Sequence, residues 1–150
     1  MRTMGGYFYL GYRKMKFSKQ PLSFSDQLTL LESRGLIISN RDYAEHYLKH
    51  LSTVRNVCAH HSRLWNREFT FTFKLPKKHP PELLSNLNFS PIAKKKLYNS
   101  LVMLEYLMEI ISPGTHWKNR LTDLIDKHGI DTGKMGFPSD WHELEIWKTR

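Results

Sequence analysis

An amphipathic pattern that runs from Arg41 to about Asn66 constrains the fold of this chain more than any other feature. Asn40, a residue type that favours helix N-termini, directly precedes it. The stretch holds no proline or glycine that would end a helix early. At about 100° per residue, its apolar residues fall within roughly 60° of one another: Leu51, Val54, Cys58 and Trp65. The pattern predicts one long helix with these side chains facing inward.

The opposite face of the predicted helix carries side chains that bind anions and transfer protons. Taking Leu51 as the origin, four residues fall between roughly 120° and 180°: Asn56, His60, Arg63 and Arg67. Arg55 lies near roughly 40°, at the margin of the apolar stripe, from which its long side chain can swing toward the polar group. These residue types can hold a phosphate, move a proton and stabilise a developing negative charge.

Two other interpretations of this face bear on its chemistry. A polar helix face with several basic residues is often only solvated surface. A zinc site needs three or four ligands, whereas Cys58 is predicted to face inward and no carboxylate lies close to His60 and His61 in the sequence. We therefore predict no metal site. His61 falls nearer the apolar flank, which predicts a structural role.

The rest of the chain also favours helices. Ser23 precedes a helical pattern that ends at Arg34-Gly35, and Asp26 is its third residue. The dipeptide Ser90-Pro91 is typical of a helix start and predicts a helix to Ile111. A further helix is predicted between Thr115 and the stop at residues 127–129.

Three non-helical regions complete the predicted architecture. Residues 69–73 alternate aromatic and threonine side chains, which predicts a short extended segment. The tail from Asp131 is turn-rich, and we expect Trp141 and Trp147 to fold back onto the helices. The sequence thus predicts a mainly α protein, a helical bundle forming a single domain over residues 18–150. Residues 1–17 are predicted to be a poorly ordered extension.

Composition and charge narrow the class of partner. The chain has 23 lysines and arginines against 14 acidic residues, a net charge of +9. Such an excess favours an anionic partner, and nucleic acid is the commonest. The single cysteine excludes an intramolecular disulfide, and no apolar run reaches the length of about 20 residues that spans a bilayer. We expect a cytoplasmic protein without a membrane partner.

Residues 55–67 also resemble a known signature. They read Arg-Asn-Val-Cys-Ala-His-His-Ser-Arg-Leu-Trp-Asn-Arg, which resembles the signature block of the bacterial abortive-infection (Abi-type) proteins. That block is similar in turn to the Arg-Asn-x-x-x-His motif of the HEPN superfamily of helical ribonucleases. Residues 19–38 resemble the opening of an Abi-type protein, and residues 135–147 its closing segment. By this resemblance, the chain is interpreted as a short form that lacks the long helical middle section of the family.

The resemblance implies a HEPN-like bundle and a metal-independent endoribonuclease of phage defence that needs no cofactor. His60 would serve as acid or base, Arg55 would bind the phosphate and Asn56 would orient His60. Arg63 and Arg67 would bind the RNA backbone. Because one chain supplies one such histidine, the resemblance also implies a homodimer with a composite site at its interface.

Two alternatives to catalysis remain at this point. A shortened bundle can keep the basic face and lose the geometry for cleavage, which would leave a non-catalytic RNA-binding or interaction module. The block could also be a structural relic whose polar residues satisfy one another in the core.

Overall fold

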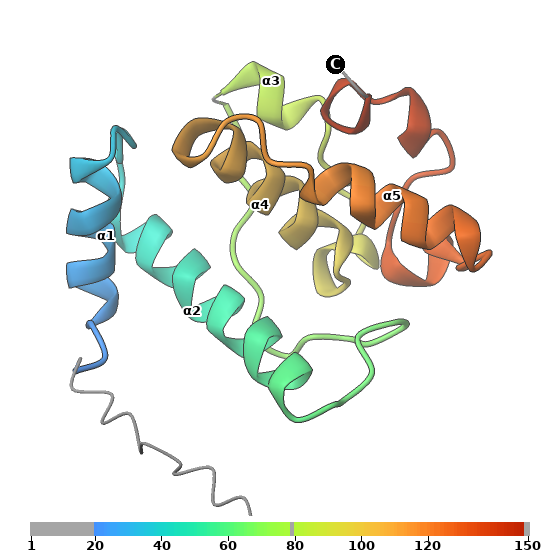
Figure 1. The fold of residues 1–150 in the computed structure, drawn as a ribbon, viewed down its shortest axis with the longest axis horizontal. Helices are drawn as coiled ribbons and strands as arrows, with labels where there is room; N and C mark the ends of the chain where they lie inside the picture. The colour runs from blue at the N-terminus through green and yellow to red at the C-terminus, as the bar shows by residue number, and fades with distance from the viewer. Residues whose placement is uncertain (1–19, 79, 149–150) are drawn as a thin grey trace, which may run out of the picture.

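The computed structural model describes residues 20–78 and 80–148, and this part of the chain is mainly helical (Figure 1). The predicted extension at residues 1–17 lies outside the described residues. Five α-helices are joined by loops and short 3-10 turns, and no strand occurs in the described ranges. The α-helices are α1 (Phe24–Ser33), α2 (Arg41–Ala59), α3 (Pro81–Leu84), α4 (Tyr98–Ile111) and α5 (Trp117–Lys127). The predicted all-α class is confirmed.

The first two helices begin where their capping residues predict. The Ser23 hydroxyl accepts a hydrogen bond from the backbone N–H of Asp26 (3.1 Å), and the Asn40 side chain accepts one from Tyr43 (2.9 Å). Each bond satisfies a donor that the first turn of a helix leaves without an intrahelical partner. Gly35 follows α1 with a φ of +100°, which suits a residue without a Cβ. Figure 1 shows α1 and α2 together on one side of the molecule, with α3, α4 and α5 on the other.

The end of α2 differs from the prediction. The helix stops at Ala59 rather than continuing to Asn66, and His60 is its C-cap. His61 has a φ of +52°; its N–H donates to the Cys58 carbonyl (2.9 Å), and that of Ser62 donates to the Val57 carbonyl (3.0 Å). This pair of bonds is the Schellman motif, which satisfies the last carbonyls of a helix. The prediction of a single helix to Asn66 is therefore wrong. The helix ends early because His61 adopts the left-handed backbone conformation that glycine usually adopts after a helix.

Residues 69–73 lie against α2 without forming a strand. Phe69 and Phe73 are buried in the core, and the Phe71 carbonyl faces the Nδ1 of His50 at 2.9 Å. The His46 ring nitrogen Nε2 lies 3.1 Å from the Thr72 carbonyl. The alternation that suggested an extended segment thus places two of its aromatic rings in the core, and side chains of α2 bind its backbone.

The helix predicted from Pro91 is divided in two. A short 3-10 turn, η1 (Ala93–Lys95), comes first, and α4 begins only at Tyr98. Ile92, near the start of the predicted helix, is 69% exposed. Lys96 lies between the two helical pieces and is buried, with its ammonium bound to Asn66. That tertiary contact competes with a continuous helix at this position.

The core is built around α4 and the C-terminal segment. Tyr98 and Val102 of α4 are fully buried. Trp141 and Trp147 are buried against the same cluster, within the 3-10 turns η3 (Trp141–Glu143) and η4 (Glu145–Trp147), so the expected return of the two tryptophans is confirmed. The middle of α2 packs against this core through Tyr47, and the residues at its C-terminal end, from Cys58 to His60, are exposed.

Candidate functional site

The last turn of α2 exposes the three residues that were predicted to be catalytic. Arg55 and Asn56 are exposed on this turn, and His60 is exposed at its C-cap. Asn56 and His60 are joined through the backbone, where the His60 N–H donates to the Asn56 carbonyl (3.0 Å). The helix therefore sets the spacing of the three residues while their side chains face solvent.

Arg63 and Arg67 lie in the loop after α2 and do not continue its polar face. Both are exposed, and the Arg67 N–H closes a turn onto the Leu64 carbonyl (3.0 Å). The predicted strip along one helix is thus replaced by a helix end and a following loop. We name this set, which consists of Arg55, Asn56, His60, Arg63 and Arg67, the basic end of α2.

Cys58 and His61, which lie next to these residues, do not face the core. Cys58, predicted to face inward, is exposed, whereas Val57 is partly buried against the core. In the last turn of α2 the side chain that packs against the core is that of Val57, so Cys58 lies on the exposed side of the turn. The exposed His61 contributes its backbone to the helix end, in the left-handed conformation described above.

The arginines of the basic end are not neutralised by any carboxylate in the described part of the chain. In the ranges 20–78 and 80–148, Arg55, Arg63 and Arg67 form no ion pair with a carboxylate. A guanidinium presents a planar fork of donors that matches the oxygens of a phosphate. The basic end of α2 can therefore accept a polyanion without first breaking an internal ion pair.

Lys96 anchors the loop of the basic end, a role that the sequence did not reveal. Lys96 follows Lys94 and Lys95 in the sequence, and those two are exposed while Lys96 is only 7% exposed. The Lys96 ammonium binds the carbonyl and side-chain oxygens of Asn66 (3.3 and 3.1 Å) and pairs with Glu68 (3.4 Å). A buried ammonium needs such partners, so the contact holds the loop at Asn66.

A second group of polar residues is buried away from this site. His50 and Ser100 are 1% and 3% exposed, and the His50 Nε2 lies 2.6 Å from the Ser100 hydroxyl. Because the Nδ1 faces a carbonyl, it must carry the proton, so Nε2 accepts from Ser100. Burial lowers the pKa of His50, an effect that the Phe71 carbonyl opposes. This pair resembles a catalytic one in its residue types, but its burial makes it a structural link between α2 and α4.

An ion pair between α4 and α5 is buried in the same way. The Lys118 ammonium lies 3.4 Å from the Glu105 carboxylate and donates to the Ile146 carbonyl (3.2 Å). Burial raises the pKa of Glu105, and the charge of Lys118 opposes that shift. The pair ties the two helices to the C-terminal segment and lies apart from the residues predicted to be functional.

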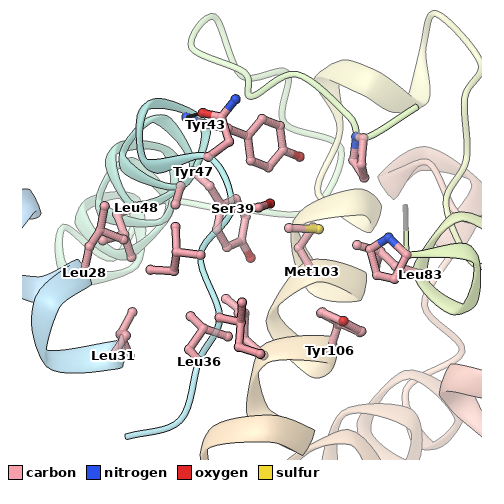
Figure 2. A pocket seen from close by; sticks show the side chains of 17 residues that line it. Leu28, Leu31, Leu36, Ser39, Tyr43, Tyr47, Leu48, Leu83, Met103 and Tyr106 are labelled. Atoms are coloured by element: carbon pink, nitrogen blue, oxygen red, sulfur yellow. Dashed lines mark hydrogen bonds between the residues drawn. The ribbon is translucent and has the colours of Figure 1, made fainter. Parts of the chain in front are cut away.

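An apolar cavity in the described part of the chain does not coincide with the basic end of α2. It has a volume of about 320 Å³ and lies between α1, the first half of α2 and α4 (Figure 2). Leu28, Tyr43 and Met103 are among its lining residues. None of the predicted site residues lines it, so this cavity plays no part in the chemistry considered below.

The described residues provide neither a cluster of metal ligands nor a helix that could span a membrane. Over the described residues, no group of three or more histidine, cysteine, aspartate or glutamate side chains could hold a metal ion. Among the helices in the same ranges, none is long and apolar enough to cross a membrane.

Comparison with known proteins finds one family that the first part of the chain resembles. Residues 4–66 match the model of a family described as Abi-like protein. The match includes Arg55, Asn56, His60 and Arg63, and it begins before residue 19, where the resemblance noted from the sequence starts. No curated protein and no solved structure matches the chain.

Proposed function

We propose that this chain, which matches the Abi-like family over residues 4–66, is a phage-defence protein. In this proposal it cleaves RNA without a metal ion. The family match supports the defence role. The proposal of RNA cleavage rests on one observation above all, the exposure of Arg55, Asn56 and His60 together at the end of α2.

The proposed reaction uses the ribose 2′-hydroxyl of the RNA as the nucleophile. That hydroxyl loses a proton as its oxygen attacks the adjacent phosphorus, and the bond to the 5′-oxygen breaks as that oxygen gains a proton. His60 is suited to one of these proton transfers, because histidine changes its charge near neutral pH. Arg55 is suited to stabilising the negative charge that builds on the phosphate oxygens in the transition state.

A second copy of the chain would complete the site. The reaction needs both a base and an acid, and one basic end offers one His60 in the motif. We propose that two copies pair about a two-fold axis with their α2 ends facing one another, so that each contributes Arg55 and His60. The exposure of these side chains leaves them accessible to a partner, and the phosphate would lie between them.

One feature favours a second candidate function, a non-catalytic RNA-binding module. The contact that joins Asn56 to His60 is a backbone bond, and Asn56 was expected to orient the His60 ring. Catalytic side chains work best when neighbouring groups hold them in place. A chain that keeps the exposed arginines of the basic end but leaves His60 loosely held would bind RNA and leave it intact.

Incubation with a mixed RNA pool in EDTA separates the two candidates. The nuclease proposal predicts cleavage by the wild-type chain, ends that carry a 2′,3′-cyclic phosphate, and no cleavage of DNA of the same sequence. His60→Ala should abolish the activity, whereas His128→Ala, which changes another exposed histidine, should retain it. RNA binding without cleavage would favour the module, and neither binding nor cleavage would contradict both candidates.

A further inference from the structure

Trp65 connects the basic end of α2 to a segment that lies far away in the sequence. Its indole N–H donates to the Asp131 carbonyl at 3.1 Å, and its ring is partly buried against the core. Asp131 directly precedes the 3-10 turn η2 (Thr132–Met135), which carries Lys134. The hydrogen bond therefore holds this turn beside the loop that follows α2.

Two cations share the Trp65 ring. The Arg63 guanidinium lies 5.4 Å from the ring centroid and the Lys134 ammonium lies 5.0 Å from it. Both charges must then lie within about 11 Å of each other, although their residues are far apart in the chain. Contact with the ring also restricts both long side chains before any ligand binds, which lowers the entropy lost on binding.

Lys96 provides one anchor for both segments. Its ammonium binds Asn66, in the loop of Arg63, while its Cβ lies beneath Gly136, directly after η2. Gly136 has a φ of +86°, and a Cβ added there would come within 2.8 Å of the Lys96 Cβ and 3.1 Å of the Ala93 Cα. Only glycine at position 136 allows the segment after η2 to approach Lys96 this closely. The packing of Gly136 on Lys96 therefore fixes η2, and with it Lys134, beside the loop of Trp65.

The charges around Trp65 favour an anionic ligand. Arg63 has no carboxylate partner among the described residues, and Lys134 pairs with Asp131 at 3.4 Å with both side chains about half exposed. Exposed pairs of this kind contribute little, so a phosphate can compete for the lysine. The same loop leads back to His60, where the proposed function places the scissile phosphate.

We propose that Arg63 and Lys134, held on Trp65, form a binding site for the RNA phosphodiester backbone next to the proposed catalytic residues. The inference rests on the proposed function for its ligand and adds the C-terminal segment to the RNA interface. The RNA strand then crosses from the end of α2 to η2, so two regions of the chain bind one substrate. Lys134 and Trp65 become binding and positioning residues, and neither takes part in proton transfer.

The test measures binding separately from cleavage. A labelled single-stranded 2′-O-methyl RNA, which cannot be cleaved through its 2′-oxygen, is titrated with the full chain at several salt concentrations. Arg63→Gln and Lys134→Gln should each weaken binding several-fold and reduce the slope of log K against log salt by about 0.7, the value for one lost phosphate contact on a single strand. Lys78→Gln removes an exposed charge from the loop before α3 and should leave the slope unchanged.

The outcomes for this site and for the nuclease are distinguishable. Unchanged slopes in both Arg63→Gln and Lys134→Gln would overturn the inference, even if natural RNA is still cleaved in a His60-dependent way. Reduced slopes without any cleavage of natural RNA would support the site and contradict the nuclease. If Lys78→Gln lowers the slope as much as Lys134→Gln, binding is non-specific and the inference also fails.

Discussion

Replacing Ser100 with alanine should destabilise the fold by leaving a buried ring nitrogen without a donor. His50 is 1% exposed, its Nδ1 proton is committed to the Phe71 carbonyl, and its Nε2 accepts from the Ser100 hydroxyl at 2.6 Å. Ser100→Ala removes that donor and is too small a change to admit a new partner. A buried polar group left unsatisfied costs about 1–3 kcal/mol. The Tyr47 hydroxyl donates to the Ser100 backbone carbonyl, so that bond survives the substitution.

Urea denaturation followed by circular dichroism measures this cost. With an m-value of about 2 kcal/mol/M for a chain of this size, a loss of about 2 kcal/mol lowers the midpoint by about 1 M at constant m. Ser112→Ala, at the exposed C-cap of α4, provides the control and should leave the midpoint nearly unchanged. A midpoint for Ser100→Ala equal to that of the control would refute the assignment of His50 as a buried acceptor.

Three further outcomes follow from the buried polar groups. Burial lowers the pKa of His50 in the folded state, so the unfolded chain takes up a proton at this histidine first as the pH falls. The free energy of unfolding should therefore fall below about pH 6.5. In urea denaturation, His50→Gln should lose less of its free energy of unfolding between about pH 7.5 and 5.5 than the wild-type chain does. Tyr43→Phe should change the free energy of unfolding by less than about 0.5 kcal/mol, because this buried hydroxyl has no hydrogen-bond partner among the described residues, whereas Tyr47→Phe should cost about 1 kcal/mol; equal losses would contradict the assignment. Lys118→Met should cost about 3–5 kcal/mol by leaving Glu105 buried without its cation, and adding Glu105→Leu should recover most of that loss; no recovery in the double variant would argue against the buried pair.

The parts of the fold that the sequence predicts correctly depend on neighbouring residues. Ser23 and Asn40 begin their helices as predicted because a cap bonds to a backbone group three residues away. The end of α2 is determined locally too, but the usual signal is missing because His61 occupies a position where glycine is the common residue. The sequence therefore predicted the start of this helix and placed its end too late.

The remaining differences depend on contacts between distant residues. The break before α4 accompanies the contact of Lys96 with Asn66, which is 30 residues away, and the His50–Ser100 pair joins residues 50 apart. No periodicity in the sequence reports such contacts. The candidate site follows the same division. The exposure of Asn56 and His60 was predictable from one helix face, although Arg55, predicted at the margin of the apolar stripe, is exposed as well. The position of Lys134 beside Trp65 required the fold.

The measurement that tests the proposed function most directly separates RNA cleavage from RNA affinity. Single-turnover cleavage of natural RNA in EDTA and binding of the 2′-O-methyl analogue are measured for the wild-type chain, Arg55→Ala and His60→Ala. Both substitutions should abolish cleavage and leave affinity nearly unchanged, because the other basic residues supply most of the binding while the chemical step depends on these two. Cleavage at the wild-type rate in both variants would contradict the proposal that the end of α2 is the catalytic site.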